Sequence, residues 1–273
     1  MKNRVILVTG GAGFIGSHLV DRLIKEYPEK IIVVDNFFLG KKENLEEAKK
    51  EFDNLKIIQG DASDYELMKE LLSKESVDIV YDLAIIPLPA SLERPSLAFN
   101  INIKIALTLI ELLRQDFYTT LVHFSSSEAY GDLLYQPMNE KHPLYPKTPY
   151  AASKAAQDHL LYSYYKTFGV DVRIIRPFNT YGPRQNEGSY AAVIPATIKR
   201  ILNNETPIIF GDGKQTRDYL YVSDVVDASV KIYNTNRCKG EIINIGSGKE
   251  TVSYTHLRAH ETRHDLVCRL LLE

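Results

Sequence analysis

Residues 5–16 read Val5-Ile-Leu-Val-Thr-Gly-Gly-Ala-Gly-Phe-Ile-Gly16, an apolar run that breaks directly into a glycine-rich turn. The apolar run predicts a buried strand, and the residues after the turn predict a helix. Bare backbone amides and the positive end of that helix would together face one pyrophosphate. The first glycines permit the tight turn, Gly13 lets the pyrophosphate approach, and Gly16 lets helix pack on strand.

The rest of the first 177 residues alternates between apolar runs and stretches of helical period. Apolar runs bounded by polar residues occur at 31–34, 55–58, 77–82, 120–124 and 170–175. Helical-period stretches lie between them at 17–27, 64–74, 102–115 and 151–168. This alternation predicts an α/β fold, a doubly wound parallel sheet of the Rossmann type with ligands at the carboxyl ends of the strands.

The pattern divides the chain into three parts. Residues 1–177 are predicted to form the dinucleotide-binding domain, with the catalytic residues. From 178 to 251 prolines and a polar loop interrupt the rhythm, which indicates a smaller substrate-binding lobe. Residues 252–273 look like translated adapter read-through rather than native sequence, so we expect the lobe to be incomplete.

The anomalous tail contains a metalloprotease-like pattern. His260-Glu-Thr-Arg-His264 spells His-Glu-x-x-His, which on a helix would place two zinc ligands one turn apart. No third ligand or buried site accompanies it in the sequence. We therefore predict no metal site.

Composition limits the class of protein. A formal net charge of -2 gives no indication of nucleic-acid binding or of an anionic membrane surface. Two cysteines exclude a disulfide framework, and no signal peptide or membrane-spanning run is apparent. These features favour a soluble protein of the reducing cytoplasm.

Two aspartates at strand ends refine the prediction of the ligand. Asp35 follows the second apolar run about 20 residues after the glycines, where the fingerprint requires a ribose acceptor. Its carboxylate would bond the 2′-hydroxyl of NAD and repel the 2′-phosphate of NADP; otherwise it is an ordinary turn former. Asp61, after the third run, fits either an adenine contact or a helix N-cap. The predicted cofactor is NAD.

A second constellation predicts redox chemistry. Tyr150 and Lys154 lie one helical turn apart, and Ser126 follows the strand at 120–124. A phenol has a pKa of about 10, too high for a good base at neutral pH. The ammonium of Lys154 and the charge of an oxidised nicotinamide would favour the phenolate.

Five motifs in order resemble one family over residues 1 to about 251. They are Thr9-Gly-Gly-Ala-Gly-Phe-Ile-Gly16, Ser125-Ser-Ser-Glu-Ala-Tyr-Gly131, Tyr150-Ala-Ala-Ser-Lys154, Arg176-Pro-Phe-Asn-Thr-Tyr-Gly-Pro183 and Gly211-Asp-Gly-Lys-Gln-Thr-Arg-Asp218. The chain resembles the extended short-chain dehydrogenase/reductases, and within them the nucleotide-sugar epimerases and dehydratases.

The resemblance implies roles for particular residues. It makes Tyr150 the base, Lys154 its partner and Ser126 the third catalytic residue. It places Asn179 and Arg217 on the diphosphate of an NDP-sugar. It also implies a homodimer through the helices at 102–115 and 151–168. Residues expected to contact the cofactor are Gly10, Gly13, Phe14, Ile15, Gly16, Asp35, Asn36, Asp61, Ala62, Leu83, Ala84, Asn102, Tyr150 and Lys154.

The reaction itself stays open between two outcomes of a 4-keto intermediate. Return of hydride to the opposite face gives a 4-epimerase, and loss of the 6-hydroxyl gives a 4,6-dehydratase. Glu128 is typical of dehydratases and decarboxylases, yet Ser127 stands where many dehydratases have an aspartic acid, and Glu128 could simply cap or pair near its loop. A non-catalytic NAD-binding regulator or scaffold is the alternative, although such relatives typically lose the tyrosine or lysine.

Overall fold

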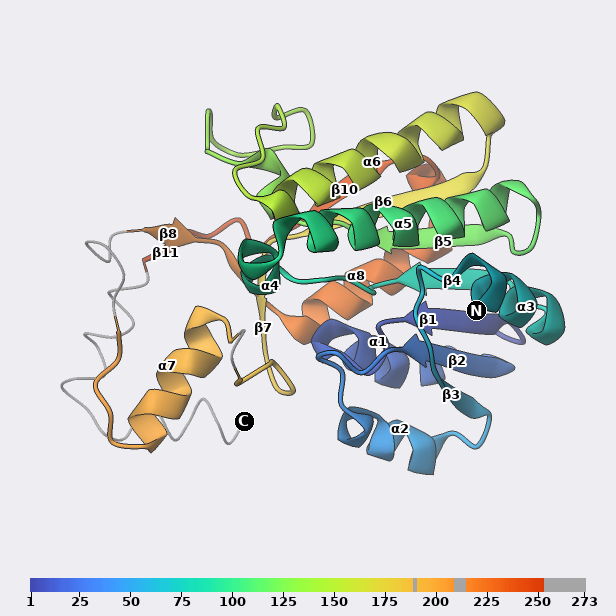
Figure 1. Cartoon of the computed structure of the whole chain (residues 1–273), viewed down its shortest axis with the longest axis horizontal. Coiled ribbons are helices and arrows are strands. Elements are labelled where there is room, and N and C mark those ends of the chain that lie inside the picture. Colours follow the sequence, from blue (N-terminus) through green and yellow to red (C-terminus); the bar gives the residue numbers. More distant parts are fainter. Residues whose placement is uncertain (189–190, 209–214, 253–273) are drawn as a thin grey trace.

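A computed structural model of the chain describes residues 1–188, 191–208 and 215–252. At its centre is a seven-stranded sheet in the order β10-β6-β5-β4-β1-β2-β3, with every neighbouring pair parallel (Figure 1). The prediction of a doubly wound parallel sheet is confirmed. The strands of the sheet are β1 (Val5–Thr9), β2 (Lys30–Asp35), β3 (Leu55–Gln59), β4 (Ile79–Asp82), β5 (Thr120–Phe124), β6 (Asp171–Pro177) and β10 (Ile242–Ile245).

The central strand explains why the opening run is apolar throughout. β1 is buried along its whole length, and its Ile6 pairs with Ile31 of β2 on one side and Ile79 of β4 on the other. A strand with neighbours on both edges and helices over both faces has no polar side. The strand order reverses at β1 and β4, and a ligand crevice is expected at that point.

Helices cover both faces of the sheet (Figure 1). Apolar side chains of α1 and α8 share one core cluster, and those of α3, α5 and α6 share the other. α5 and α6 also pack against each other along their length. The main helices are α1 (Phe14–Ile24), α2 (Glu46–Glu51), α3 (Tyr65–Glu75), α4 (Leu88–Glu93), α5 (Pro95–Arg114), α6 (Pro149–Phe168) and α8 (Val222–Asn234), with short 3-10 turns η1 (Lys42–Leu45), η2 (Ser127–Tyr130) and η3 (Asn236–Cys238).

The ends of α6, which carries Tyr150 and Lys154, are encoded locally. The Thr148 hydroxyl accepts a hydrogen bond from the amide of Ala151, and Pro149 occupies the first turn, where it needs no backbone partner. Gly169 ends the helix with a φ of +70°. Pro95 likewise occupies the first turn of α5. This helix therefore begins at Pro95, earlier than residue 102, where the sequence pattern predicted its start.

The structure divides the chain differently from the predicted boundary at residue 177. α8 returns to pack on α1, and β10 pairs with β6 at the edge of the main sheet. The difference arises because β10 is separated from β6 by a long stretch of chain. The sequence of such an edge strand does not indicate which sheet it joins. The elements outside the main sheet are β7 (Asn179–Tyr181), α7 (Val193–Leu202), β8 (Thr216–Arg217), β9 (Tyr219–Tyr221) and β11 (Thr251–Val252).

One helix in the described ranges, α5, is long and apolar enough to cross a membrane by length and composition alone. Half of that apolar window is buried inside the protein, against the sheet and α6. A core helix of a globular domain has the same composition. The tail from residue 253 onward, with its His260–His264 pattern, lies outside the described residues.

Candidate active site

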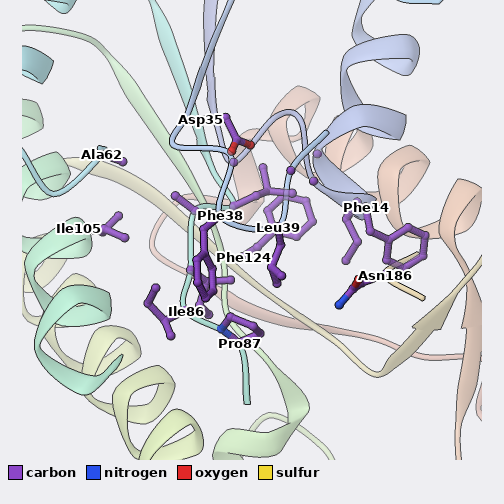
Figure 2. Close-up of a pocket in the computed structure, with 18 of the residues that line it drawn as sticks. Phe14, Asp35, Phe38, Leu39, Ala62, Ile86, Pro87, Ile105, Phe124 and Asn186 are labelled. Carbon is purple, nitrogen blue, oxygen red and sulfur yellow. The ribbon is translucent and has the colours of Figure 1, made fainter. Parts of the chain in front are cut away.

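A cavity of about 420 Å³ opens at the carboxyl edge of the sheet, beside the point where strand order reverses (Figure 2). Its walls come from the glycine turn, the loops after β2, β3 and β4, the start of α6 and the segment 177–186. The predicted cofactor residues that line it are Gly10, Gly13, Phe14, Ile15, Gly16, Asp35, Asn36, Asp61, Ala62, Leu83, Ala84, Tyr150 and Lys154.

The glycine turn has the geometry of an anion cradle. Gly10 has a φ of +65°, and a Cβ there would lie 2.8 Å from the amide nitrogen of Ala84. Gly13 is the N-cap of α1 and offers no side chain to the first helical amides. Those amides face the cavity without a capping group, so the turn fits a pyrophosphate.

Asp35 combines both interpretations given to it from the sequence. Its carboxylate is 7% exposed and lines the cavity, where a ribose acceptor is needed. It also holds the turn, because it accepts hydrogen bonds from the amides of Ala12 at 2.9 Å and Phe37 at 2.8 Å. Burial raises the pKa of Asp35, and the two amide bonds oppose that rise.

Asp61 also lines the cavity, and its carboxylate accepts a hydrogen bond from the amide of Ser63 at 2.8 Å. The N-cap of the following helix is Asp64, which accepts from the amides of Glu66 and Leu67. The helix-cap alternative for Asp61 is therefore wrong. Its place on the wall leaves it available to an adenine ring.

The catalytic constellation comes together at the floor of the same cavity. β5 ends just before Ser126, α6 carries Tyr150 and Lys154, and all three residues line the pocket. The Ser126 hydroxyl is near enough to the Tyr150 phenol to lower its pKa. The Lys154 ammonium is 3% exposed and donates to the carbonyl of Phe124 at 2.6 Å.

The electrostatics differ from the expectation that Lys154 acidifies the phenol. Burial raises the pKa of Tyr150 to about 12, against the lowering effect of Ser126. Burial also lowers the pKa of Lys154 to about 8. Desolvation disfavours both charged forms, so the protein's own groups do not generate the phenolate. An additional positive charge in the pocket is needed for that.

Ser127 and Glu128 lie beside the pocket rather than in its wall. Both belong to the short turn η2, where Ser127 is half-buried and Glu128 is exposed. Glu128 is close enough for its charge to raise the pKa of Tyr150. Its amide, rather than its carboxylate, contacts the catalytic Ser126 at 3.2 Å.

The predicted sugar-diphosphate residues lie together outside the main sheet. Asn179 is on β7, and its backbone amide donates to the carbonyl of Asp218 at 3.0 Å. Arg217, next in sequence to Asp218, is exposed on β8 and donates to the carbonyl of Thr216 at 2.8 Å. Neither side chain lines the dinucleotide cavity.

Asn102 was predicted both as a cofactor contact and, from the resemblance, as a support of the active-site helix; it does not line the cavity, and its contacts agree with the supporting role. It is fully buried, exchanges hydrogen bonds with both backbone groups of Ile86, and donates to Ser153 at 3.0 Å. It thus ties the cavity-lining loop after β4 to the catalytic helix. An amide with both a donor and an acceptor suits this clamp.

Several residues at the site were not predicted from the sequence. Phe38 and Leu39 line the cavity beside Asp35 (Figure 2). Arg184 also lines the cavity and is paired with Asp21 of α1 at 2.7 Å. Asp82 and His123 are polar residues near the ends of apolar strands, and this pattern could have predicted that they are buried together. No metal-binding group of three His, Cys, Asp or Glu occurs within residues 1–188, 191–208 and 215–252.

A doubly wound sheet with an anion cradle, a ribose acceptor and a serine–tyrosine–lysine cluster in one cavity defines a dinucleotide-dependent enzyme of the short-chain dehydrogenase/reductase class. A sequence model of the family described as "NAD dependent epimerase/dehydratase family" matches residues 6–246. The chain belongs to this family. It is an NAD-dependent enzyme, and its cavity has the cradle and acceptor that NAD requires.

Individual relatives show how similar the chain is to known members. It is 40% identical over 248 residues to a putative UDP-glucose 4-epimerase of Methanocaldococcus jannaschii, covering 90% of this chain and 78% of the relative. It is 38% identical to a dTDP-D-glucose 4,6-dehydratase of Dictyostelium discoideum, covering 90% of this chain and 58% of the relative. Among solved structures, a UDP-N-acetylglucosamine 4-epimerase of Methanobrevibacter ruminantium, in complex with UDP-N-acetylmuramic acid, aligns with a TM-score of 0.88 at 36% identity, covering 96% of this chain and 82% of that one.

Proposed function

We propose that this protein is a nucleotide-sugar 4-epimerase, which inverts C4 of an NDP-hexose through a transient 4-keto sugar with no net change in redox state. The observation that carries the proposal is the meeting of Ser126, Tyr150 and Lys154 in the wall of the dinucleotide cavity. Solved relatives include a UDP-glucose 4-epimerase of Thermus thermophilus in complex with NAD, at 32% identity and a TM-score of 0.81, covering 94% of this chain and 82% of that one.

The cofactor residues hold NAD at both ends of the cavity. The glycine turn and the start of α1 would bind the pyrophosphate, while Asp35 would accept a ribose hydroxyl and Asp61 would contact the adenine; all of them line the cavity. When bound, NAD supplies reversible hydride transfer and a positive charge at the nicotinamide. Burial raises the pKa of Tyr150 to about 12, and a positive charge at the nicotinamide would lower that pKa again.

Proton transfer belongs to the protein's own side chains. Tyr150 removes the proton of the sugar 4-hydroxyl. It returns the proton after the keto sugar has rotated in the site and presents its opposite face. Ser126, near the phenol, holds the same sugar oxygen and relays the proton. Lys154, one helical turn from Tyr150 on α6, is buried against the carbonyl of Phe124 and keeps its ammonium within the same cavity wall.

Epimerisation needs fewer protein groups than elimination, and this favours the epimerase. Loss of the 6-hydroxyl needs an acid to protonate the leaving group and a base to take the proton at C5. Ser127 offers a hydroxyl where an acid is needed, and Glu128 is exposed outside the cavity wall. A 4,6-dehydratase remains the second candidate because Glu128 is near enough to influence Tyr150.

A panel of NDP-hexoses, incubated with the protein and NAD and followed by NMR, separates these candidates. We expect a sugar inverted at C4 and no accumulated ketone. A 4-keto-6-deoxy product would replace the epimerase proposal with the dehydratase, and it should then depend on Glu128, as tested by Glu128→Gln. NAD binding without turnover of any sugar would favour a regulator or scaffold.

Tyr150→Phe tests the identity of the base. It should lower turnover by at least about 10²-fold, in line with the usual contribution of a positioned acid–base group. NAD binding, measured by calorimetry, should stay within about twofold, because the ring that lines the cavity is retained. Tyr162→Phe, on the exposed part of the same helix, is the matched control and should leave turnover unchanged. Full turnover in Tyr150→Phe would assign the base elsewhere.

The substrate-binding lobe, the association of two copies and the cellular location complete the proposal. The predicted substrate-binding lobe of residues 178–251 would bind the sugar nucleotide through its described elements outside the main sheet, β7, β8, β9 and β11, with Asn179 and Arg217 at the diphosphate. Two copies associate through α5 and α6, where Leu97 and Leu107 of α5 are 48% and 42% exposed. The enzyme acts in the cytoplasm, in keeping with a sequence that has only two cysteines.

A further inference from the structure

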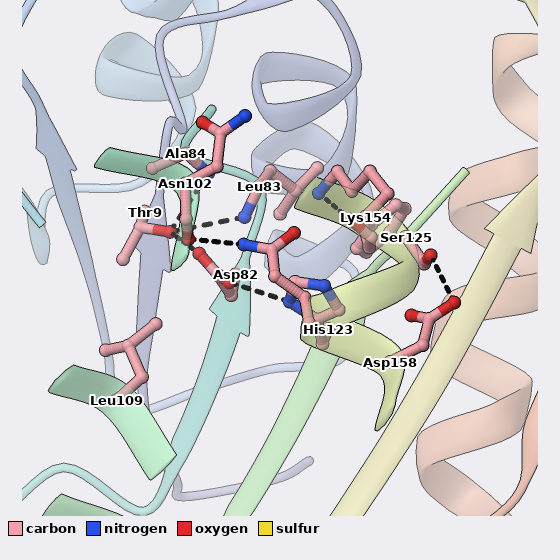
Figure 3. Close-up of polar contacts among 12 residues, drawn as sticks. Thr9, Asp82, Leu83, Ala84, Asn102, Leu109, His123, Ser125, Lys154 and Asp158 are labelled. Atoms are coloured by element: carbon pink, nitrogen blue, oxygen red, sulfur yellow. Dashed lines mark hydrogen bonds and ion pairs between the residues drawn. The ribbon is translucent and has the colours of Figure 1, made fainter. Parts of the chain in front are cut away.

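Three polar side chains form a closed group beneath the catalytic pocket (Figure 3). Asp82, at the end of β4, accepts a hydrogen bond from the Thr9 hydroxyl at 2.7 Å with one oxygen. Its other oxygen lies 2.8 Å from Nδ1 of His123. Thr9 and His123 are fully buried and Asp82 is 1% exposed, so no solvent screens this carboxylate.

The group holds part of the cavity wall through Thr9. The Thr9 hydroxyl oxygen accepts hydrogen bonds from the amides of Leu83 and Ala84, each at 3.2 Å. Both residues line the dinucleotide cavity. The Thr9 hydroxyl has one proton, which it donates to Asp82, so its lone pairs are directed at the two amides. The carboxylate therefore fixes the orientation of the hydroxyl toward Leu83 and Ala84.

The same carboxylate is buried close to Lys154, whose ammonium donates to the carbonyl of Phe124, the residue next to His123, and its charge raises the pKa of that lysine. The charged or titratable groups around Lys154 are Asp82 from β4, with His123 of β5 beyond it, and Tyr150 and Asp158 on α6. Asp158 is compensated, since Arg176 of β6 contacts it at 2.8 Å and Ser125 also donates to it. The hydrogen-bond partners of Asp82 are the Thr9 hydroxyl and the His123 ring, and its charge acts more strongly on Lys154 than that of Asp158.

We propose that Asp82, held by Thr9 and His123, is a positioning residue of this reaction: it orders the Leu83–Ala84 wall and supplies the buried countercharge that keeps Lys154 an ammonium beside the catalytic phenol. The inference rests on the proposed function for its role in turnover. Its role in cofactor binding stands independently, because Lys154 and Leu83–Ala84 line the dinucleotide cavity itself.

The shifts in pKa agree with this geometry. Burial lowers the pKa of Lys154 to about 8, and Asp82 is the larger of the two charges that oppose the fall. For Asp82 itself burial raises the pKa, but the His123 hydrogen bond, with smaller contributions from Lys154 and Thr9, gives a net lowering. The carboxylate therefore stays ionised at neutral pH although it is buried.

Asp82→Asn is the direct test, since it removes the charge and nearly preserves the shape. Without the carboxylate, the pKa of Lys154 should fall further, and the ammonium should be lost at a lower pH. We expect the basic limb of the kcat profile to move down by about one pH unit. The affinity for NAD, titrated by calorimetry from pH 6 to 9.5, should show the same downward shift, whether or not a sugar turns over.

Thr9→Val separates wall positioning from charge. It removes the hydroxyl that holds the two amides and leaves the carboxylate in place. NAD affinity should weaken by up to about tenfold at every pH, with the basic limb unmoved. A merely structural role for Asp82 would make Asp82→Asn behave like this variant, with no shift in pH dependence, and that result would overturn the proposal.

His123 provides a second pair of variants if Asp82→Asn fails to fold. His123→Asn keeps a donor near the position of Nδ1 and should retain the wild-type pH profile. His123→Leu removes the donor, so the pKa of Asp82 should rise until its charge is lost near neutral pH, reproducing the downward shift. Identical profiles for the two variants would contradict the inference. Failure to find a sugar substrate would affect only the proposed function, because the NAD titrations still decide this one.

Discussion

At the scale of single atoms, the glycines of the first turn have separable tasks. A Cβ on Gly16 would lie 2.2 Å from the carbonyl oxygen of Gly10, so any side chain there must displace backbone. A Cβ on Gly13 meets that same oxygen at 3.1 Å, which a small shift relieves. Gly16 is thus required by packing, whereas Gly13 is required by the ligand.

Gly16→Ala and Gly13→Ala should separate these tasks. Gly16→Ala should destabilise the protein by about 1–3 kcal/mol, as overpacking typically does, and should weaken NAD binding as well. Gly13→Ala should leave thermal stability nearly unchanged and still weaken NAD, because the added methyl occupies the pyrophosphate approach. Differential scanning calorimetry and NAD titration measure the two effects. Equal losses of stability would contradict the distinction.

The sequence predicted the site residues that touch the ligand better than those that support them. Glycines, Asp35 and the Tyr150–Lys154 spacing follow from backbone rules and the chemistry of one ligand. Asp82, Asn102 and Asp158 act through contacts with distant segments, such as the 2.8 Å bond of Asp158 to Ser125. Such contacts depend on the packing of α5, α6 and the sheet, which spacing along the chain does not encode.

At the scale of elements, capping residues set where the helices around the site begin. α3 follows the cavity residues Asp61 and Ala62, and its N-cap Asp64 accepts from the amides of Glu66 and Leu67 at 3.1 and 3.2 Å. The helix ends at Ser76, which adopts a left-handed φ of 51°. The adenine side of the cavity therefore depends on a helix whose start is fixed by one carboxylate.

Asp64→Ala should cost about 1 kcal/mol of unfolding free energy, the usual value of an N-cap. For a protein of this size that corresponds to a fall in Tm of roughly 2–4 °C. Asp64→Asn should be nearly silent, because asparagine caps helices as well. Asp53→Ala, at an exposed position, controls for loss of a surface charge. A cap without energetic value would give equal Tm for the alanine variants.

At the scale of the whole molecule, the fold was predictable up to β6 and not beyond it. The alternation of buried strands and amphipathic helices determines a doubly wound sheet. A strand at residues 241–245 was predictable from its isoleucines, but its place beside β6 was not, because β10 follows a long excursion and only Ile245 of its apolar residues is buried. Edge strands with partly exposed faces lack the continuous apolar run of a central strand.

A chain ended after residue 177 should fail to fold into a soluble domain. It loses β10 along the edge of β6 and the buried α8 residues Val225, Val226 and Val230, each worth on the order of 1.5–3 kcal/mol. The exposed strand edge would also promote aggregation. Size-exclusion chromatography and circular dichroism, with residues 1–252 as the control, measure the outcome. A monomeric, cooperatively unfolding 1–177 fragment would refute it.

The Arg176–Asp158 ion pair has an evolutionary consequence. Both side chains are almost fully buried, and Arg176 also stacks on Tyr130 with its guanidinium carbon 4.7 Å from the ring centroid. Removing one partner would strand the other charge in the interior, at a cost of about 3–5 kcal/mol. Descendants of this chain can therefore lose the two residues together but hardly one at a time, and the two positions should mutate as a linked unit across lineages.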